Sequence, residues 1–105
     1  MIYTVQFSAA ADEDLEQLFD FVLQRELESE TGDLDIAERA LQAIKDGLGF
    51  LSVSPFACRK VGDNPFVREL IITFGSSGYV ALFEIVDGST VIIGAIRHQR
   101  EDDYH

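Results

Sequence analysis

Apolar and polar residues follow two different periods along this chain. Residues 2–7 alternate with a period of two and are rich in β-forming residues, which predicts a strand. Ser8 is a good N-cap residue and an acidic stretch follows it, so we expect a helix to begin there. Apolar residues then recur at steps of three and four, and a polar segment at residues 28–32, which contains a glycine, interrupts this pattern. The pattern predicts two helices, the second over residues 35–52. The apolar positions are Leu15, Leu18, Phe19, Val22 and Leu23 in the first helix and Ala37, Ala40, Leu41, Ile44, Leu48 and Leu51 in the second.

The second half of the chain shows mainly the strand period. Prolines and a glycine punctuate residues 54–65, so we expect an irregular connection that carries Arg59 and Lys60. Residues 67–74, 79–86 and 90–98 then predict three strands joined by tight turns. The order strand-helix-helix-strand-strand-strand predicts a single α+β domain over residues 1–105. We expect a two-layer sandwich in which a helical hairpin covers one face of an antiparallel sheet.

A two-layer sandwich leaves the second face of its sheet without helices. Neighbouring residues of a strand point to opposite faces, so only one of two apolar sets can pack under the helices. We place Leu70, Ile72, Ala81, Phe83, Ile93 and Ala95 under the helices. The set that then stays outside is Ile71, Val80, Leu82, Ile92 and Ile96. The sequence therefore predicts an apolar sheet face open to a partner.

Composition and charge narrow the functional classes. No apolar run approaches the roughly 20 residues that a membrane helix needs, and no secretion signal is recognisable, so we expect a cytoplasmic protein. Cys58 is the only cysteine, which excludes an internal disulfide and makes a small buried apolar residue the default interpretation. The formal charge of -11 is uneven: residues 1–58 carry a net of -9, and residues 59–105 carry a net of -2. An anion-binding surface is therefore expected in the second half.

Three segments carry a resemblance to a known family. They are the start, YTVQFSAAADEDL (3–15), then VRELIITFG (67–75), then residues 79–83 followed by 91–98 with the ending RHQRE (97–101). In order, spacing and total length the chain resembles the RelE/ParE superfamily of toxins from bacterial type II toxin-antitoxin (plasmid stabilisation) modules, and is closer to the ParE-like branch. The resemblance implies a cognate antitoxin as partner. We expect no cofactor, no metal, no membrane partner and no direct sequence-specific DNA binding by this chain alone. The resemblance leaves open a homodimer or a hetero-oligomer with the antitoxin.

The superfamily offers two activities, inhibition of DNA gyrase (ParE-like) and cleavage of messenger RNA on the ribosome (RelE-like). A nuclease needs dense positive charge to hold RNA and to stabilise its transition state. This acidic chain supplies little positive charge, so we favour gyrase inhibition, which requires no enzymatic chemistry of the toxin. A third alternative is a degenerate toxin that only binds antitoxin.

The resemblance also implies site residues. If the chain is RelE-like, the catalytic residues are Arg68, Arg97, His98 and Tyr104. The expected target-binding residues are Arg59, Lys60, Arg97, His98, Arg100 and Tyr104. The expected antitoxin-binding residues are Phe21, Phe56, Phe66, Ile71, Val80 and Leu82. Structural alternatives exist for several of these: a surface ion pair of Arg68 with Glu69, a hydrogen-bonded edge position for His98, and packing of Tyr104 against the domain.

Overall fold

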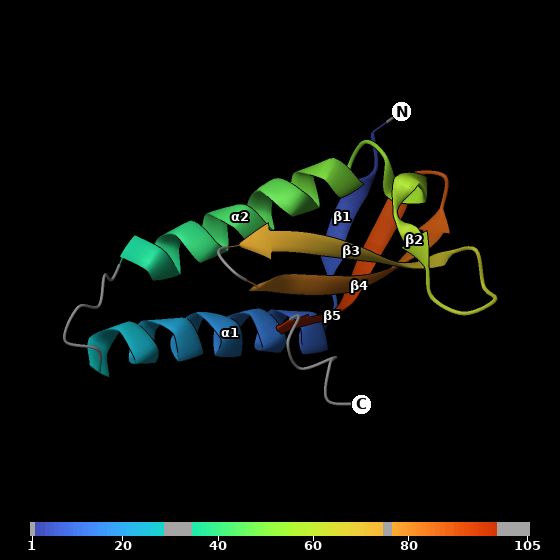
Figure 1. Ribbon diagram of the computed structural model, residues 1–105. Helices are drawn as coiled ribbons and strands as arrows, with labels where there is room; N and C mark the ends of the chain where they lie inside the picture. Colours follow the sequence, from blue (N-terminus) through green and yellow to red (C-terminus); the bar gives the residue numbers. More distant parts are fainter. Residues whose placement is uncertain (1, 29–34, 75–76, 99–105) are drawn as a thin grey trace.

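The structure is a computed structural model that describes residues 2–28, 35–74 and 77–98 (Figure 1). Its elements follow the predicted order, with two short additions between the helices and the strands. They are β1 (Thr4–Phe7), α1 (Ala9–Glu28), α2 (Asp35–Leu51), the 3-10 helix η1 (Pro55–Ala57), β2 (Arg59–Lys60), β3 (Val67–Phe74), β4 (Ser77–Asp87) and β5 (Thr90–His98). Of the polar link predicted at 28–32, Glu28 ends α1, and the remaining residues lie outside the described residues, as does part of the first tight turn.

Ser8 is where the chain changes from strand to helix. Its hydroxyl oxygen accepts a hydrogen bond from the backbone N–H of Ala11 at 3.1 Å, which satisfies one of the amides that a helix N-terminus leaves open. The same hydroxyl donates to the carbonyl of Gly94 in β5 at 3.3 Å. The predicted N-cap is therefore confirmed, and it also ties the first turn of α1 to the sheet.

The sheet contains five strands in the order β1-β5-β4-β3-β2. Strands β2 to β5 pair antiparallel, whereas β1 pairs parallel to β5, with Thr4 opposite Thr90. The expectation of an entirely antiparallel sheet was wrong for this pair, because the alternation of β1 indicates a strand but not its partner. The expectation of an irregular connection was also wrong at Arg59 and Lys60, which form the edge strand β2.

A bulge in β5 changes which residues face the helices. Leu82 pairs with Ala95 but Phe83 pairs with Ile93, so Gly94 is an extra residue that inverts the alternation of β5. As a result Ile96 is only 2% exposed within the core, and Ala95 shares the opposite face with Leu82. The two predicted placements, Ala95 under the helices and Ile96 outside, are therefore reversed.

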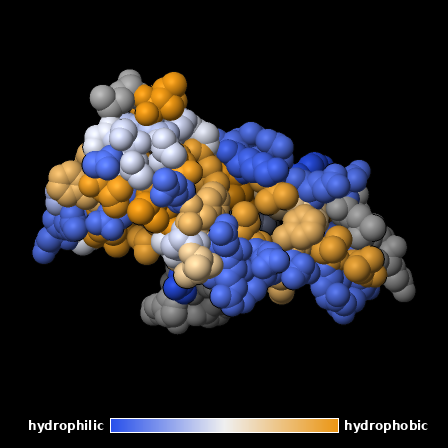
Figure 2. All heavy atoms as spheres, turned by 180° about the vertical axis from the view of Figure 1, so that it is seen from behind, coloured by the Kyte–Doolittle hydropathy of each residue, from blue (hydrophilic) through white to orange (hydrophobic). Residues whose placement is uncertain are grey.

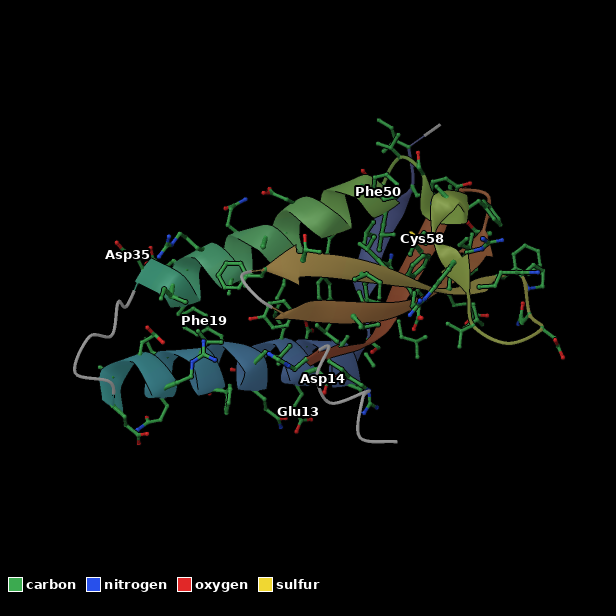
Figure 3. All side chains as sticks on the ribbon, in the orientation of Figure 1. Glu13, Asp14, Phe19, Asp35, Phe50 and Cys58 are labelled. Atoms are coloured by element: carbon green, nitrogen blue, oxygen red, sulfur yellow. The ribbon has the colours of Figure 1, made fainter. Side chains whose placement is uncertain are left out.

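The core lies between the sheet and the two helices, which run in opposite directions (Figure 1). The largest fully buried side chains are Leu51 of α2, Phe83 of β4, and Val91, Ile93 and Ile96 of β5, together with Pro55. The apolar faces of α1 and α2 meet beside Tyr79, and Phe19 lies on the side of α1 that faces α2 (Figure 3). Seen from behind, two hydrophilic bands flank a hydrophobic strip where the helices lie (Figure 2). The predicted helical faces are thus confirmed.

Within the described residues, neither helix has both the length and the hydropathy that crossing a membrane requires.

Candidate functional site

The sheet face opposite the helices, which we call the outer face, has an apolar centre. The pairs Ile71–Val80 and Leu82–Ala95 lie side by side in register, with Ile92 beyond them on β5. Ile71, Leu82 and Ile92 are partly exposed, because both helices pack on the other face. Val80, which lies between Ile71 and Arg97, is only 6% exposed, so the expectation that it lies bare was wrong. The apolar centre of the outer face thus offers the side chains of Ile71, Leu82 and Ile92 to a partner.

Charged residues border this apolar centre. Arg59 of β2 forms an ion pair with Glu69, its partner in register on β3, and both lie on the outer face. Arg97 of β5 is exposed on the same face at the other side of the apolar centre. Lys60 is also exposed, but it pairs in register with Arg68 and therefore points to the face that carries the helices. The predicted target-binding cations are thus divided between the two faces.

Arg68 holds the connection between η1 and β3. Its Nε donates to the carbonyl of Pro65 at 2.8 Å, and its Nη1 donates to the carbonyls of Phe56 and Cys58 at 3.0 and 2.7 Å. The guanidinium also lies 5.1 Å from the centre of the Phe56 ring, within cation–π range. These contacts place the positive charge of Arg68 against backbone carbonyls and an aromatic ring of its own chain. The surface ion pair with Glu69 that the sequence suggested is instead made by Arg59.

His98 packs against Tyr79 at the opposite end of the sheet. Their rings meet edge to face with centres 5.7 Å apart, and the two residues pair in register. Tyr79 is 3% exposed, and burial raises the pKa of its hydroxyl. Tyr79 therefore stays protonated at neutral pH and serves as a core residue. His98 is half-buried beside it.

The two arginines proposed for RNA cleavage, Arg68 and Arg97, lie apart on the sheet. Arg97 pairs with Val80 and Arg68 pairs with Phe83, which is three residues further along β4 and on the opposite face. Along the strands the two positions differ by three residues at about 3.3 Å each, and across the sheet by two strand spacings of about 4.8 Å each. The two perpendicular displacements together put the backbone positions roughly 14 Å apart. Arg100 and Tyr104 lie outside the described residues.

The aromatic residues expected to bind an antitoxin occupy two separate places. Phe21 is exposed on α1, where the guanidinium of Arg25 lies 5.9 Å from its ring centre. Phe56 and Phe66 meet edge to face with ring centres 6.1 Å apart, at the end of the sheet near the β4–β5 turn. The six expected residues therefore form three patches, two of them aromatic and one on the outer face.

Two features of the site had no clear signal in the sequence. Beside Phe56 and Phe66 a groove of about 390 Å³ is bordered by Glu84 and Asp87, two carboxylates that the strand pattern alone assigns to solvent. Asp14 accepts a hydrogen bond from the backbone N–H of Ile96 at 3.0 Å, although an acidic residue early in a helix suggests only an interaction with the helix dipole. Both features depend on contacts between segments far apart in the chain.

Cys58 is buried, as expected. Burial raises the pKa of its thiol, against a smaller opposing effect of Arg68, so the thiol stays protonated. The sulfur behaves as a small apolar group.

Two helices on one face of a five-stranded mixed sheet, with a partly exposed apolar centre on the other face, form the architecture expected of a RelE/ParE-type toxin. It superposes on a solved structure described as the chromosomal ParDE TA system from P. aeruginosa, with a TM-score of 0.67 and 21% identity over 92% of this chain and 96% of that chain. The sequence matches the family described as the ParE toxin of type II toxin-antitoxin system, parDE, over residues 5–103. The chain therefore belongs to the ParE toxin family. A comparison with curated proteins gave no match.

Proposed function

We propose that this chain is a toxin that inhibits DNA gyrase and is neutralised by a cognate antitoxin. Membership of the ParE toxin family supports the first part, because the resemblance to ParE-like toxins implies DNA gyrase as the target. The arrangement of the arginines supports it independently.

The observation that carries the choice of activity is the position of Arg68. An RNA-cleaving site has to aim several cations at one phosphate, where the negative charge of the transition state develops. Here Arg68 is directed at three carbonyls of its own chain, and Arg97 lies on the other face of the sheet. The formal charge of -11 also opposes long-range attraction to the ribosome and its RNA. Both observations favour a protein target over a nucleic-acid substrate.

Four of the six proposed target-binding residues lie at the end of β5 or follow it in the sequence. Arg97 is exposed there and His98 is half-buried, and Arg100 and Tyr104 continue the same segment in the sequence. Arg59 borders the outer face from the opposite edge, whereas Lys60 points away from it. We therefore give Arg97 the leading role in contacting gyrase and Lys60 none on that face.

The proposed antitoxin contact is the outer face. Its partly exposed residues Ile71, Leu82 and Ile92 adjoin one another across three strands, a surface suited to an extended or helical segment that orders on binding. Arg59 and Arg97 on either side would pair with acidic residues of that segment. Occupation of this face would also cover Arg97, so antitoxin and gyrase would compete for it.

The experiment is an ATP-dependent supercoiling assay with purified gyrase and relaxed plasmid. Addition of the chain is expected to stop supercoiling and to trap cleaved plasmid. Arg97→Glu should weaken inhibition by at least about tenfold, corresponding to 1.4 kcal/mol, whereas Arg39→Glu, an equal charge change on α2, should leave it nearly unchanged. Full supercoiling at a large excess of folded chain would overturn the proposal. Harmless expression in cells without antitoxin would in addition favour a degenerate toxin.

A further inference from the structure

The end of the sheet near the β4–β5 turn carries a concentration of exposed apolar side chains apart from the outer-face centre. Phe56 and Phe66 are 46% and 49% exposed, and Val86 beside them is 44% exposed. They line a groove of about 390 Å³, the size of a site that takes one or two side chains. Such exposure is unfavourable for an isolated protein and marks a surface that binds something.

The walls of this groove are held in place before any partner arrives. Arg68 donates to the carbonyl of Phe56 and its guanidinium lies against that ring. The backbone N–H of Phe66 donates to the side-chain oxygen of Asn64 at 2.9 Å, and the carbonyl of Phe66 accepts from Ile85 at 2.8 Å. Both phenylalanines are therefore anchored through their backbones. A partner that binds here does not have to order them, which lowers the entropic cost of binding.

Carboxylates border the apolar walls. Glu84 is exposed on β4, and Asp87 begins the turn to β5, where its Oδ1 accepts from the backbone N–H and the hydroxyl of Ser89 at 2.8 and 3.1 Å. These hydrogen bonds lower the pKa of Asp87, so its charge persists into acidic solution. The nearby cation Arg68 is directed at backbone carbonyls. The groove therefore presents aromatic walls and an acidic border.

This combination selects one kind of occupant. A lysine or arginine side chain has an aliphatic stem that packs on aromatic rings and a cationic end that pairs with carboxylates. Nucleic acids and anionic lipids are repelled by the same border. A purely apolar segment would remove water from Glu84 and Asp87 without pairing them.

We propose that the groove between Phe56, Phe66 and the β4–β5 turn binds a basic peptide segment of a partner protein. A lysine or arginine lies with its stem on the two rings and its charge between Glu84 and Asp87, and an adjoining aliphatic residue covers Val86. Arg68 acts as a positioning residue, because it orients Phe56 without contacting the peptide. The proposal is independent of whether the target of the chain is gyrase.

The test uses two synthetic peptides on the full-length chain. One is acetyl-Gly-Leu-Lys-Leu-Arg-Leu-Gly-amide, and the other replaces its lysine and arginine with glutamate. Titration is followed by fluorescence anisotropy of labelled peptide and by 1H–15N correlation spectra of the protein. Only the basic peptide should bind, and it should shift the amide signals of Phe66, Ile85 and Gly88. Binding of both peptides, of neither, or shifts centred on the acidic α1 would overturn the proposal.

Matched variants distinguish binding of the peptide at the groove from general electrostatic attraction to an acidic protein. The variant E84Q/D87N keeps an oxygen acceptor for Ser89 and should weaken binding at least about tenfold. The variant E13Q/E16Q on α1 makes the same change in net charge and should weaken it less than about twofold. An equal loss in both variants would refute a specific site. If a urea titration shows that E84Q/D87N does not fold, Val86→Lys provides the same test. This variant adds a positive charge to an exposed wall of the groove, so it should repel the basic peptide and prevent its binding.

Discussion

Replacement of Arg68 separates a structural role from a catalytic one. Arg68→Ala removes three hydrogen bonds from a charged donor to the carbonyls of Phe56, Cys58 and Pro65. Only the bond to Cys58 is partly buried, and it contributes about 1.5–3 kcal/mol as a charge-assisted bond. The two exposed bonds and the ring contact add about 0.5 kcal/mol each. Allowing for water that replaces part of these contacts, we expect the free energy of unfolding to fall by about 2–4 kcal/mol.

The assay is urea unfolding followed by far-UV circular dichroism, with two comparison variants. Arg68→Lys keeps the charge but has no planar fork to bridge the separate carbonyls, so it should recover less than half of the loss. Lys60→Ala, an exposed neighbour in register, should change the free energy of unfolding by no more than about 0.5 kcal/mol. If Arg68→Ala were as stable as Lys60→Ala, the Arg68 side chain would be available to bind a substrate, and this result would favour a nuclease.

Two further stability predictions concern the contact between helices and sheet. Asp14→Ala leaves the partly buried N–H of Ile96 without its acceptor and should lower the free energy of unfolding by about 1–3 kcal/mol. Asp20→Ala, on the exposed side of α1, should change it very little. Equal effects of the two variants in urea titrations would contradict a role of Asp14 in joining α1 to β5. A Cβ at Gly47 would lie 2.9 Å from an isoleucine side chain of β3, whereas a Cβ at Gly49 would meet open space. G47A should therefore be at least about 1 kcal/mol less stable than G49A in calorimetry. The reverse order would contradict the close approach of α2 to β3 at Gly47.

The regular elements were predictable because each depends on local chemistry. Ser8 caps α1 through an amide three residues away, and the apolar spacing of α2 is visible along the chain. The same alternation rule failed in β5, where Gly94 inserts one residue and reverses Ala95 and Ile96. A glycine within a strand suggests a bulge, but it does not determine how many residues on either side change face.

The site was less predictable because its residues act through distant contacts. Arg68 looks like a surface cation in a strand, and only the return of the chain through Phe56 and Cys58 shows where its hydrogen bonds go. The strand alternation places Val80 on the outer face together with Ile71 and Leu82, which are partly exposed. Val80 itself lies between Ile71 and Arg97 in the sheet and is almost completely buried. Sequence periodicity gives the face of a residue, whereas its exposure also depends on which strands flank it.

Gyrase inhibition can be distinguished from ribosome poisoning by the order in which DNA synthesis and protein synthesis stop after the chain is expressed in bacterial cells without an antitoxin. Incorporation of labelled thymidine and labelled methionine is followed from the moment of induction, with the Arg97→Glu variant in parallel. Gyrase inhibition predicts that DNA synthesis fails first while protein synthesis continues, and that the variant delays this failure. Arrest of protein synthesis within minutes, before any decline in DNA synthesis, would rule out gyrase as the primary target and point to the ribosome.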